Sequence, residues 1–148
     1  RNSSLDETLF NFLFILFICV FTDIGGYIFG NLFKGSKLTK ISPKKTYSGV
    51  IGGYFFSIIF ISLYIEYSYL LNLELSNQSF NLQIFILLLL ISTISQIGDI
   101  VISYFKRVSN IKDTGKIIPG HGGLLDRIDG MIFAFPFFYL IKFFSYIY

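Results

Sequence analysis

The chain has 148 residues, of which 53% are hydrophobic, 20% are aromatic and only 14% are charged, and its formal net charge is +3. A mean hydropathy of +0.67 excludes an ordinary water-soluble domain and indicates an integral membrane protein. The single cysteine, Cys19, lies among apolar residues, which excludes a disulfide or a thiolate metal site within one chain.

Four apolar runs are each long enough to cross a hydrocarbon core about 30 Å thick, which takes about 20 helical residues. They predict membrane-spanning helices at residues 8–30, 48–71, 82–105 and 127–147. The first run lacks the basic leader and the small-residue cleavage site of a secretory signal, so we expect it to be retained. The fold class that we expect is all-α, a polytopic membrane helix bundle with about four transmembrane helices.

Basic residues gather in two of the connections between these runs. The connection after the first run holds Lys34, Lys37, Lys40, Lys44 and Lys45, and the one after the third holds Lys106, Arg107, Lys112 and Lys116. Residues 71–81 contain no Lys or Arg. Because cytoplasmic loops retain Lys and Arg, we expect two basic cytoplasmic loops with residues 71–81 on the other side. Topology alone is a sufficient explanation for the first three lysines.

Acidic residues inside the predicted spans need a further explanation, because each costs a few kcal/mol at membrane depth unless it is paired, hydrated or bound to a metal. Asp99 lies on one helical face with Gln96, Ser103 and Lys106, and together they form a polar stripe. Asp23 lies beside Gly25 and Gly26 near the end of the first span. The alternatives are helix packing at Asp23 and a purely structural stripe at Asp99.

The fourth predicted helix opens with a second pair of carboxylates, Asp126 and Asp129, three residues apart and therefore on one face. Clustered carboxylates facing lysines are the oxygen ligands that Mg²⁺ shares with substrate phosphates. The preceding turn can bring backbone N–H groups close to a phosphate, and it contains Pro119, Gly120, His121, Gly122 and Gly123. No spacing of His and Cys indicates zinc.

The stretch from Ser103 to Asp129 resembles the signature of the CDP-diacylglycerol synthases, also called phosphatidate cytidylyltransferases. The matching positions are Ser103, Lys106, Arg107, Lys112, Asp113, Gly115, Pro119, Gly120, His121, Gly122, Gly123, Asp126, Arg127 and Asp129.

Three upstream elements extend the resemblance to about residues 23–130. A Gln-x-Gly-Asp element matches Gln96, Gly98 and Asp99; an Asp-x-Gly-x-Tyr-x-x-Gly element matches Asp23, Gly25, Tyr27 and Gly30; a Ser-Pro-x-Lys-Thr element matches Ser42, Pro43, Lys45 and Thr46. The chain departs from the family pattern at Asn31, Ser48 and Gly130, which puts a family role for these three positions in doubt.

The resemblance implies that residues 1–148 form a single integral-membrane catalytic domain, the C-terminal half of a longer chain. It also implies the reaction of CTP with phosphatidate to give CDP-diacylglycerol and pyrophosphate. Our hypothesis for the metal site is Asp99 and Asp126 as Mg²⁺ ligands, with Ser103 and Asp129 in or near the coordination sphere.

The resemblance assigns the remaining positions to catalysis or to substrate binding. The catalytic set comprises Asp99, Ser103, Lys106, Arg107, Asp126 and Asp129, and the substrate-binding set comprises Asp23, Ser42, Lys45, Lys112, Asp113, His121, Gly122, Gly123 and Arg127. A monovalent ion such as K⁺ is a candidate second ion. We expect CTP, phosphatidate and membrane lipid as partners, no nucleic acid, a homodimer by family resemblance, and a multi-pass protein of the inner cell membrane.

Two rival functions stay open at this stage. A CTP-dependent polyprenol or phytol kinase would transfer the γ-phosphoryl group instead of CMP, and its products would differ accordingly. A membrane transporter or channel would place its carboxylates nearer the midplane of the membrane and would need no loop of glycine, histidine and basic residues.

Overall fold

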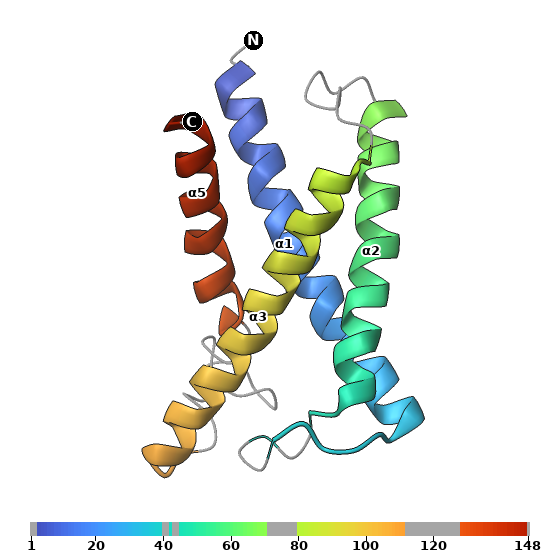
Figure 1. Cartoon of the computed structure of the whole chain (residues 1–148), viewed down its shortest axis with the longest axis vertical. Helices are drawn as coiled ribbons and strands as arrows, with labels where there is room; N and C mark the ends of the chain where they lie inside the picture. Colours follow the sequence, from blue (N-terminus) through green and yellow to red (C-terminus); the bar gives the residue numbers. More distant parts are fainter. Residues whose placement is uncertain (1–2, 40–41, 43–44, 71–79, 112–127, 148) are drawn as a thin grey trace, which may run out of the picture.

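The computed structural model describes residues 3–39, 42, 45–70, 80–111 and 128–147. Within these residues every regular element is a helix, apart from one isolated antiparallel bridge between Lys37 and Thr46. The helices are α1 (Ser3–Phe33), α2 (Tyr47–Leu70), α3 (Leu82–Val108) and α5 (Met131–Ile147), shown in Figure 1. The predicted all-α fold class is confirmed.

Three of these helices contain stretches long and apolar enough to cross a membrane, at Glu7–Phe33, Tyr47–Ser68 and Leu82–Val108. They confirm the first three predicted spans, and the first and third stretches are longer than predicted by about one helical turn. The fourth predicted span is represented by a shorter apolar helix, since α5 has only 17 residues. The three long apolar helices make the chain a membrane protein. α5 is the shortest of the described helices.

α5 begins at Met131, whereas the apolar pattern predicted a start at residue 127. Asp129 and Gly130 form a turn, and the Asp129 Oδ1 accepts a hydrogen bond from the Gly130 N–H at 3.0 Å. The Gly130 carbonyl then accepts the first helical bonds, from Phe133 and Ala134. Asp129 therefore precedes the helix, and the prediction that it lies on the first turn of the fourth span was wrong.

α1 and α2 pack closely along the part of their length that leads to the α1–α2 connection. A Cβ added to Gly52 would lie 2.2 Å from the Cβ of Phe29, and one added to Gly25 would lie 2.5 Å from the Gly52 carbonyl oxygen. Small residues let two helices approach where lipid provides no hydrophobic drive for association. α3 runs obliquely across the bundle, and it contacts α1, α2 and α5 (Figure 1).

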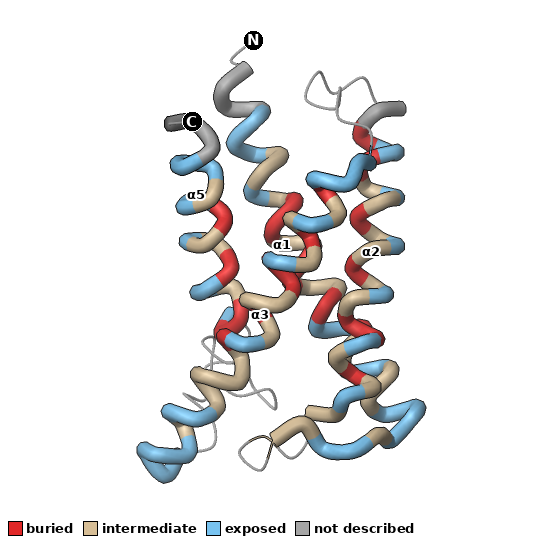
Figure 2. Tube along the Cα trace, in the orientation of Figure 1, coloured by how far each residue is buried: buried red, intermediate tan, exposed pale blue. Residues whose placement is uncertain are grey.

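The buried side chains form one core on the inward faces of all four helices (Figure 2). The core residues are Phe14, Ile15, Ile18 and Cys19 from α1, Ile61 and Ile65 from α2, Ile84, Leu88 and Ile91 from α3, and Ala134 and Phe138 from α5. Large apolar side chains also lie exposed on every helix, among them Leu63, Leu82 and Phe143. Such a surface suits contact with lipid, because water would disfavour it.

Candidate functional site

The connection from α1 to α2 folds back on itself and sets the position of Lys45. Backbone hydrogen bonds join the Leu38 N–H to the Lys45 carbonyl at 2.8 Å and the Tyr47 N–H to the Ser36 carbonyl at 3.1 Å. Thr46 then caps α2, because its Oγ1 accepts a hydrogen bond from the Gly49 N–H at 3.1 Å. Lys45 is thus held at the junction between the connection and α2.

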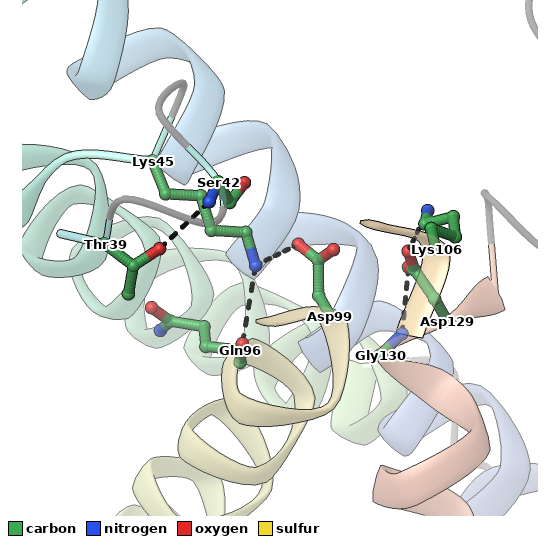
Figure 3. A network of polar contacts seen from close by, with 8 residues as sticks. All are labelled: Thr39, Ser42, Lys45, Gln96, Asp99, Lys106, Asp129 and Gly130. Carbon is green, nitrogen blue, oxygen red and sulfur yellow. Dashed lines mark hydrogen bonds and ion pairs between the residues drawn. The ribbon is translucent and has the colours of Figure 1, made fainter. Parts of the chain in front are cut away.

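Lys45 extends from this junction to α3 (Figure 3). Its ammonium group forms an ion pair with Asp99 and donates a hydrogen bond to the carbonyl oxygen of Gln96 at 3.5 Å. Ser42 shapes the turn just before it: its carbonyl accepts from the Lys45 N–H at 3.1 Å, and its own N–H donates to Thr39 Oγ1 at 3.1 Å. The connection and α3 therefore meet through one lysine.

A second ion pair joins the end of α3 to the turn before α5. The Lys106 Nζ lies 3.6 Å from the Asp129 Oδ2, and their side chains are only 13% and 10% exposed. Figure 3 shows this pair beside the Lys45–Asp99 pair. Gly130 brings the turn against α3, since an added Cβ would lie 2.5 Å from the Ser95 Oγ and 2.8 Å from the Ser95 carbonyl oxygen. The close approach leaves no room for a side chain at position 130.

The acidic side chains of this region influence one another. Asp129 lies outside the three helices long enough to cross a membrane. Burial, and next the neighbouring Asp99 carboxylate, raise the pKa of Asp129 from its ordinary value of 3.8 to about 6, against the opposing effect of Lys106. A bound cation would offset the repulsion between the Asp99 and Asp129 carboxylates.

A cleft of about 240 Å³ opens between α1, α2 and α3 beside these pairs. Its lining combines two carboxylates and one lysine with hydroxyl, amide and glycine positions. The lining residues are Thr22, Asp23, Gly26, Tyr27, Leu38, Lys45, Thr46, Gly49, Val50, Gln96, Asp99 and Ile100. The cleft can therefore hold a small polar ligand between three helices and the α1–α2 connection.

The structure brings together Asp23, Lys45 and Asp99 in the cleft, with Ser42 in the turn before Lys45. Asp129 lies next to Asp99 and pairs with Lys106. Two further predicted residues lie along the last turns of α3. Ser103 is half-buried and Arg107 is exposed, and neither lines the cleft that the described residues form. The roles predicted for these two residues stay predictions.

Seven predicted site residues fall outside the described residues: Lys112, Asp113, His121, Gly122, Gly123, Asp126 and Arg127. The predicted pairing of Asp99 with Asp126 as metal ligands is therefore untested. In the part of the chain that the structure describes, no group of three or more His, Cys, Asp or Glu side chains is arranged to hold a metal ion. The donor chemistry nevertheless fits a hard divalent cation, because the neighbouring carboxylates of Asp99 and Asp129 offer the oxygen ligands that such ions prefer.

Two polar residues that we did not predict belong to this region, Thr22 and Ser92. They hydrogen-bond to each other at 2.9 Å between α1 and α3, and Gln96 Nε2 donates to the same Ser92 Oγ at 3.4 Å. The sequence carried a signal for Ser92, which lies seven residues before Asp99 and hence on the same face of α3. Thr22 gave no comparable signal beyond its position next to Asp23.

The positions that depart from the family pattern have local explanations in two cases. Ser48 accepts a hydrogen bond from the Gly35 N–H at 3.3 Å and hydrogen-bonds to Thr46 at 3.1 Å, so it supports the connection that carries Lys45. Gly130 packs against Ser95 as described above. Asn31 is exposed near the end of α1, and nothing in the structure explains its identity.

The fold and the site together define a class of membrane protein. In this class a helical bundle holds a cleft, lined by a lysine and carboxylates, where three helices meet. The sequence model of the Cytidylyltransferase family matches residues 2–145, and the chain belongs to this family.

Curated relatives agree with this assignment. A "Phosphatidate cytidylyltransferase" of Rickettsia conorii is 40% identical over 135 residues, covering 88% of this chain and 57% of the relative. A protein of the same name from Staphylococcus aureus is 42% identical over 134 residues, covering 88% of this chain and 48% of the relative. The chain spans about half the length of the curated relatives that it matches.

Proposed function

We propose that the protein transfers the CMP moiety of CTP to phosphatidate, forming CDP-diacylglycerol and pyrophosphate. The observation that carries the proposal is the cleft in which Lys45 meets Asp99, in a chain that matches the Cytidylyltransferase family over residues 2–145. The names of the curated relatives support the same substrates. A cleft bordered by membrane-spanning helices suits a reaction between a water-soluble nucleotide and a lipid.

In this reaction a phosphate oxygen of phosphatidate attacks the α-phosphorus of CTP. A new P–O bond forms, the bond between the α-phosphorus and the bridging oxygen breaks, and pyrophosphate leaves with that oxygen. The protein needs to bring two anions together and to hold them in line, which is mainly positioning and electrostatic stabilisation. No covalent enzyme intermediate is required, and Ser103 is not proposed as a nucleophile.

The described residues supply parts for this task. Lys45 and Lys106 place positive charge on either side of the Asp99 and Asp129 carboxylates, where they can hold phosphate oxygens. Asp99, together with Asp126 outside the described residues, is proposed to hold Mg²⁺. Neutralising the charge of the triphosphate and of the leaving pyrophosphate is the chemistry that bound Mg²⁺ supplies.

The finer features expected from the resemblance remain proposals. They include K⁺ as a second ion, a homodimer, and an inner membrane location with the cleft on the cytoplasmic side. Lys45 of the α1–α2 connection lines the cleft, and Lys34 and Lys37 lie in the same connection, which supports this orientation.

Replacing Asp99 tests the proposal at the residue level. In the full-length protein in detergent, with CTP, phosphatidate and Mg²⁺, we expect Asp99→Asn to lower CDP-diacylglycerol formation on the order of 100-fold, as for loss of one electrostatic group from a transition state. The matched control is Glu7→Gln, which removes a carboxylate paired with Lys142 far from the cleft. Near-parent turnover by a folded Asp99→Asn protein would contradict the assignment.

A further inference from the structure

A small polar contact lies beneath the cleft, between α1 and α3. The Thr22 Oγ1 and the Ser92 Oγ are 2.9 Å apart, and these residues are 1% and 0% exposed. Gln96 Nε2 donates to the same Ser92 oxygen at 3.4 Å. We call these three residues the Thr22–Ser92–Gln96 clamp. Thr22 and Gln96 also line the cleft, so the clamp forms part of its floor.

The clamp is connected directly to the charged groups of the cleft. On α3, Ser92, Gln96 and Asp99 follow one another along a single helical face. The carbonyl of Gln96 accepts a hydrogen bond from Lys45, and the carboxylate of Asp99 pairs with the same ammonium group. Anything that fixes this face of α3 therefore fixes both partners of Lys45.

On α1, the clamp residue Thr22 immediately precedes Asp23, which lines the cleft. A rotation of α1 about its axis would break the Thr22–Ser92 contact and turn Asp23 away from Asp99. α2 closes the remaining side, because a Cβ added to Gly53 would lie 2.8 Å from the Thr22 carbonyl oxygen and 3.6 Å from Gln96 Nε2. Three helices therefore meet at the clamp.

We propose that Thr22 and Ser92 are positioning residues that lock the rotation of α1 against α3, so that Asp23 and Asp99 border one cleft and Lys45 reaches its partners on α3. Apolar helix faces in lipid can pack in several rotations, whereas a buried hydroxyl pair specifies one. Neither residue belongs to the sequence pattern of the family quoted above. The consequence for turnover rests on the proposed function, but the structural role does not.

The chain offers a matched control for the clamp. Tyr54 Oη and Thr93 Oγ1 hydrogen-bond at 2.8 Å between α2 and α3, one residue along α3 from Ser92. Neither Tyr54 nor Thr93 lines the cleft. Tyr54→Phe therefore removes an interhelical hydroxyl contact at the same level without changing the cleft.

The first test measures how fast a water-soluble amine-reactive reagent labels Lys45 in the full-length protein, read by peptide mass spectrometry. Lys45 is partly shielded by its ion pair, its side chain being 23% exposed. We expect Thr22→Val and Ser92→Ala to raise the labelling rate several-fold, Thr22→Ser to restore the parent rate, and Tyr54→Phe to leave it unchanged. Labelling rates are compared only among variants whose thermal unfolding midpoints lie near that of the parent.

Parent-like labelling of Lys45 in folded Thr22→Val or Ser92→Ala protein would overturn the proposal. An equal rise in Tyr54→Phe would also overturn it, because the effect would then be general loosening of the bundle. Since labelling does not depend on turnover, this test gives its answer even if the protein lacks the proposed activity.

The second test separates the kinetic parameters with CTP and phosphatidate as substrates. Because the clamp orients groups that act on bound substrates, we expect Thr22→Val to lower kcat several-fold with little change in the KM for CTP, and Thr22→Ser to recover kcat. Unchanged kcat in Thr22→Val would contradict the positioning role. An inactive parent would refute the proposed function and leave the labelling result standing.

Discussion

At the residue scale, Asp129 is a buried carboxylate that lies between a second carboxylate and a lysine. Its carboxylate lies beside Asp99 and 3.6 Å from Lys106, and its pKa is raised to about 6. The pKa is therefore higher in the folded protein than the ordinary value of 3.8 expected for the unfolded chain. Because the folded state binds this proton more tightly than the unfolded chain does, protonation of Asp129 stabilises the folded protein at low pH. This stabilisation is lost as the pH rises through about 6.

The direction of this pH dependence gives a prediction for protein from which divalent cations have been removed. Between pH 4 and pH 7 we expect the free energy of unfolding of the parent to fall, relative to Asp129→Asn, on the order of 2 kcal/mol. Chemical unfolding in detergent with a chelator, followed at several pH values, measures the difference. Parallel pH profiles for the two proteins would show that Asp129 titrates in the folded protein as it does in the unfolded chain.

At the scale of the elements, the packing of α1 on α2 depends on glycine where the helices are closest. Because an added Cβ at Gly52 would lie 2.2 Å from the Cβ of Phe29, a methyl group there needs the two helices to separate. We expect Gly52→Ala to cost about 1–3 kcal/mol, as overpacking of a close contact does.

Gly26→Ala is the matched control in the same interface. Its added Cβ would lie 3.5 Å from the Gly49 carbonyl oxygen, an ordinary contact distance. We expect this variant to be neutral or slightly stabilising, since alanine favours the helix. Thermal unfolding in detergent compares the two, and equal midpoints would contradict the close packing at Gly52.

Apolar runs predicted the helices of this fold well, because a lipid environment requires long uninterrupted apolar segments. The late start of α5 escaped the prediction, since the turn at Asp129 and Gly130 packs against Ser95, which lies far away in the sequence. Helical periodicity placed Gln96 and Asp99 on one face, and family resemblance singled out Lys45. The meeting of Lys45 with Asp99 and of Thr22 with Ser92 depends on how whole helices rotate against each other, which local sequence does not encode.

At the scale of the whole molecule, the described helices place two ion pairs and a cleft at one end of a membrane bundle. Lys45 arrives from the α1–α2 connection, Asp99 and Lys106 from α3, and Asp129 from the turn before α5. Segments distant in the sequence thus converge on one polar region, whose carboxylates favour a cation and whose lysines favour phosphate. This arrangement suits the proposed nucleotidyl transfer to lipid, and the products of the reaction distinguish it from a γ-phosphoryl transfer or an ion flux.

The most direct measurement follows the two ends of the triphosphate separately. CTP labelled at the α-phosphorus, and in a parallel reaction at the γ-phosphorus, is incubated with phosphatidate, Mg²⁺ and the full-length protein. We predict that the α-label enters the solvent-extractable lipid as CDP-diacylglycerol while the γ-label stays in water as pyrophosphate. Transfer of the γ-label to a lipid acceptor, or solute flux without any CTP turnover, would contradict the account.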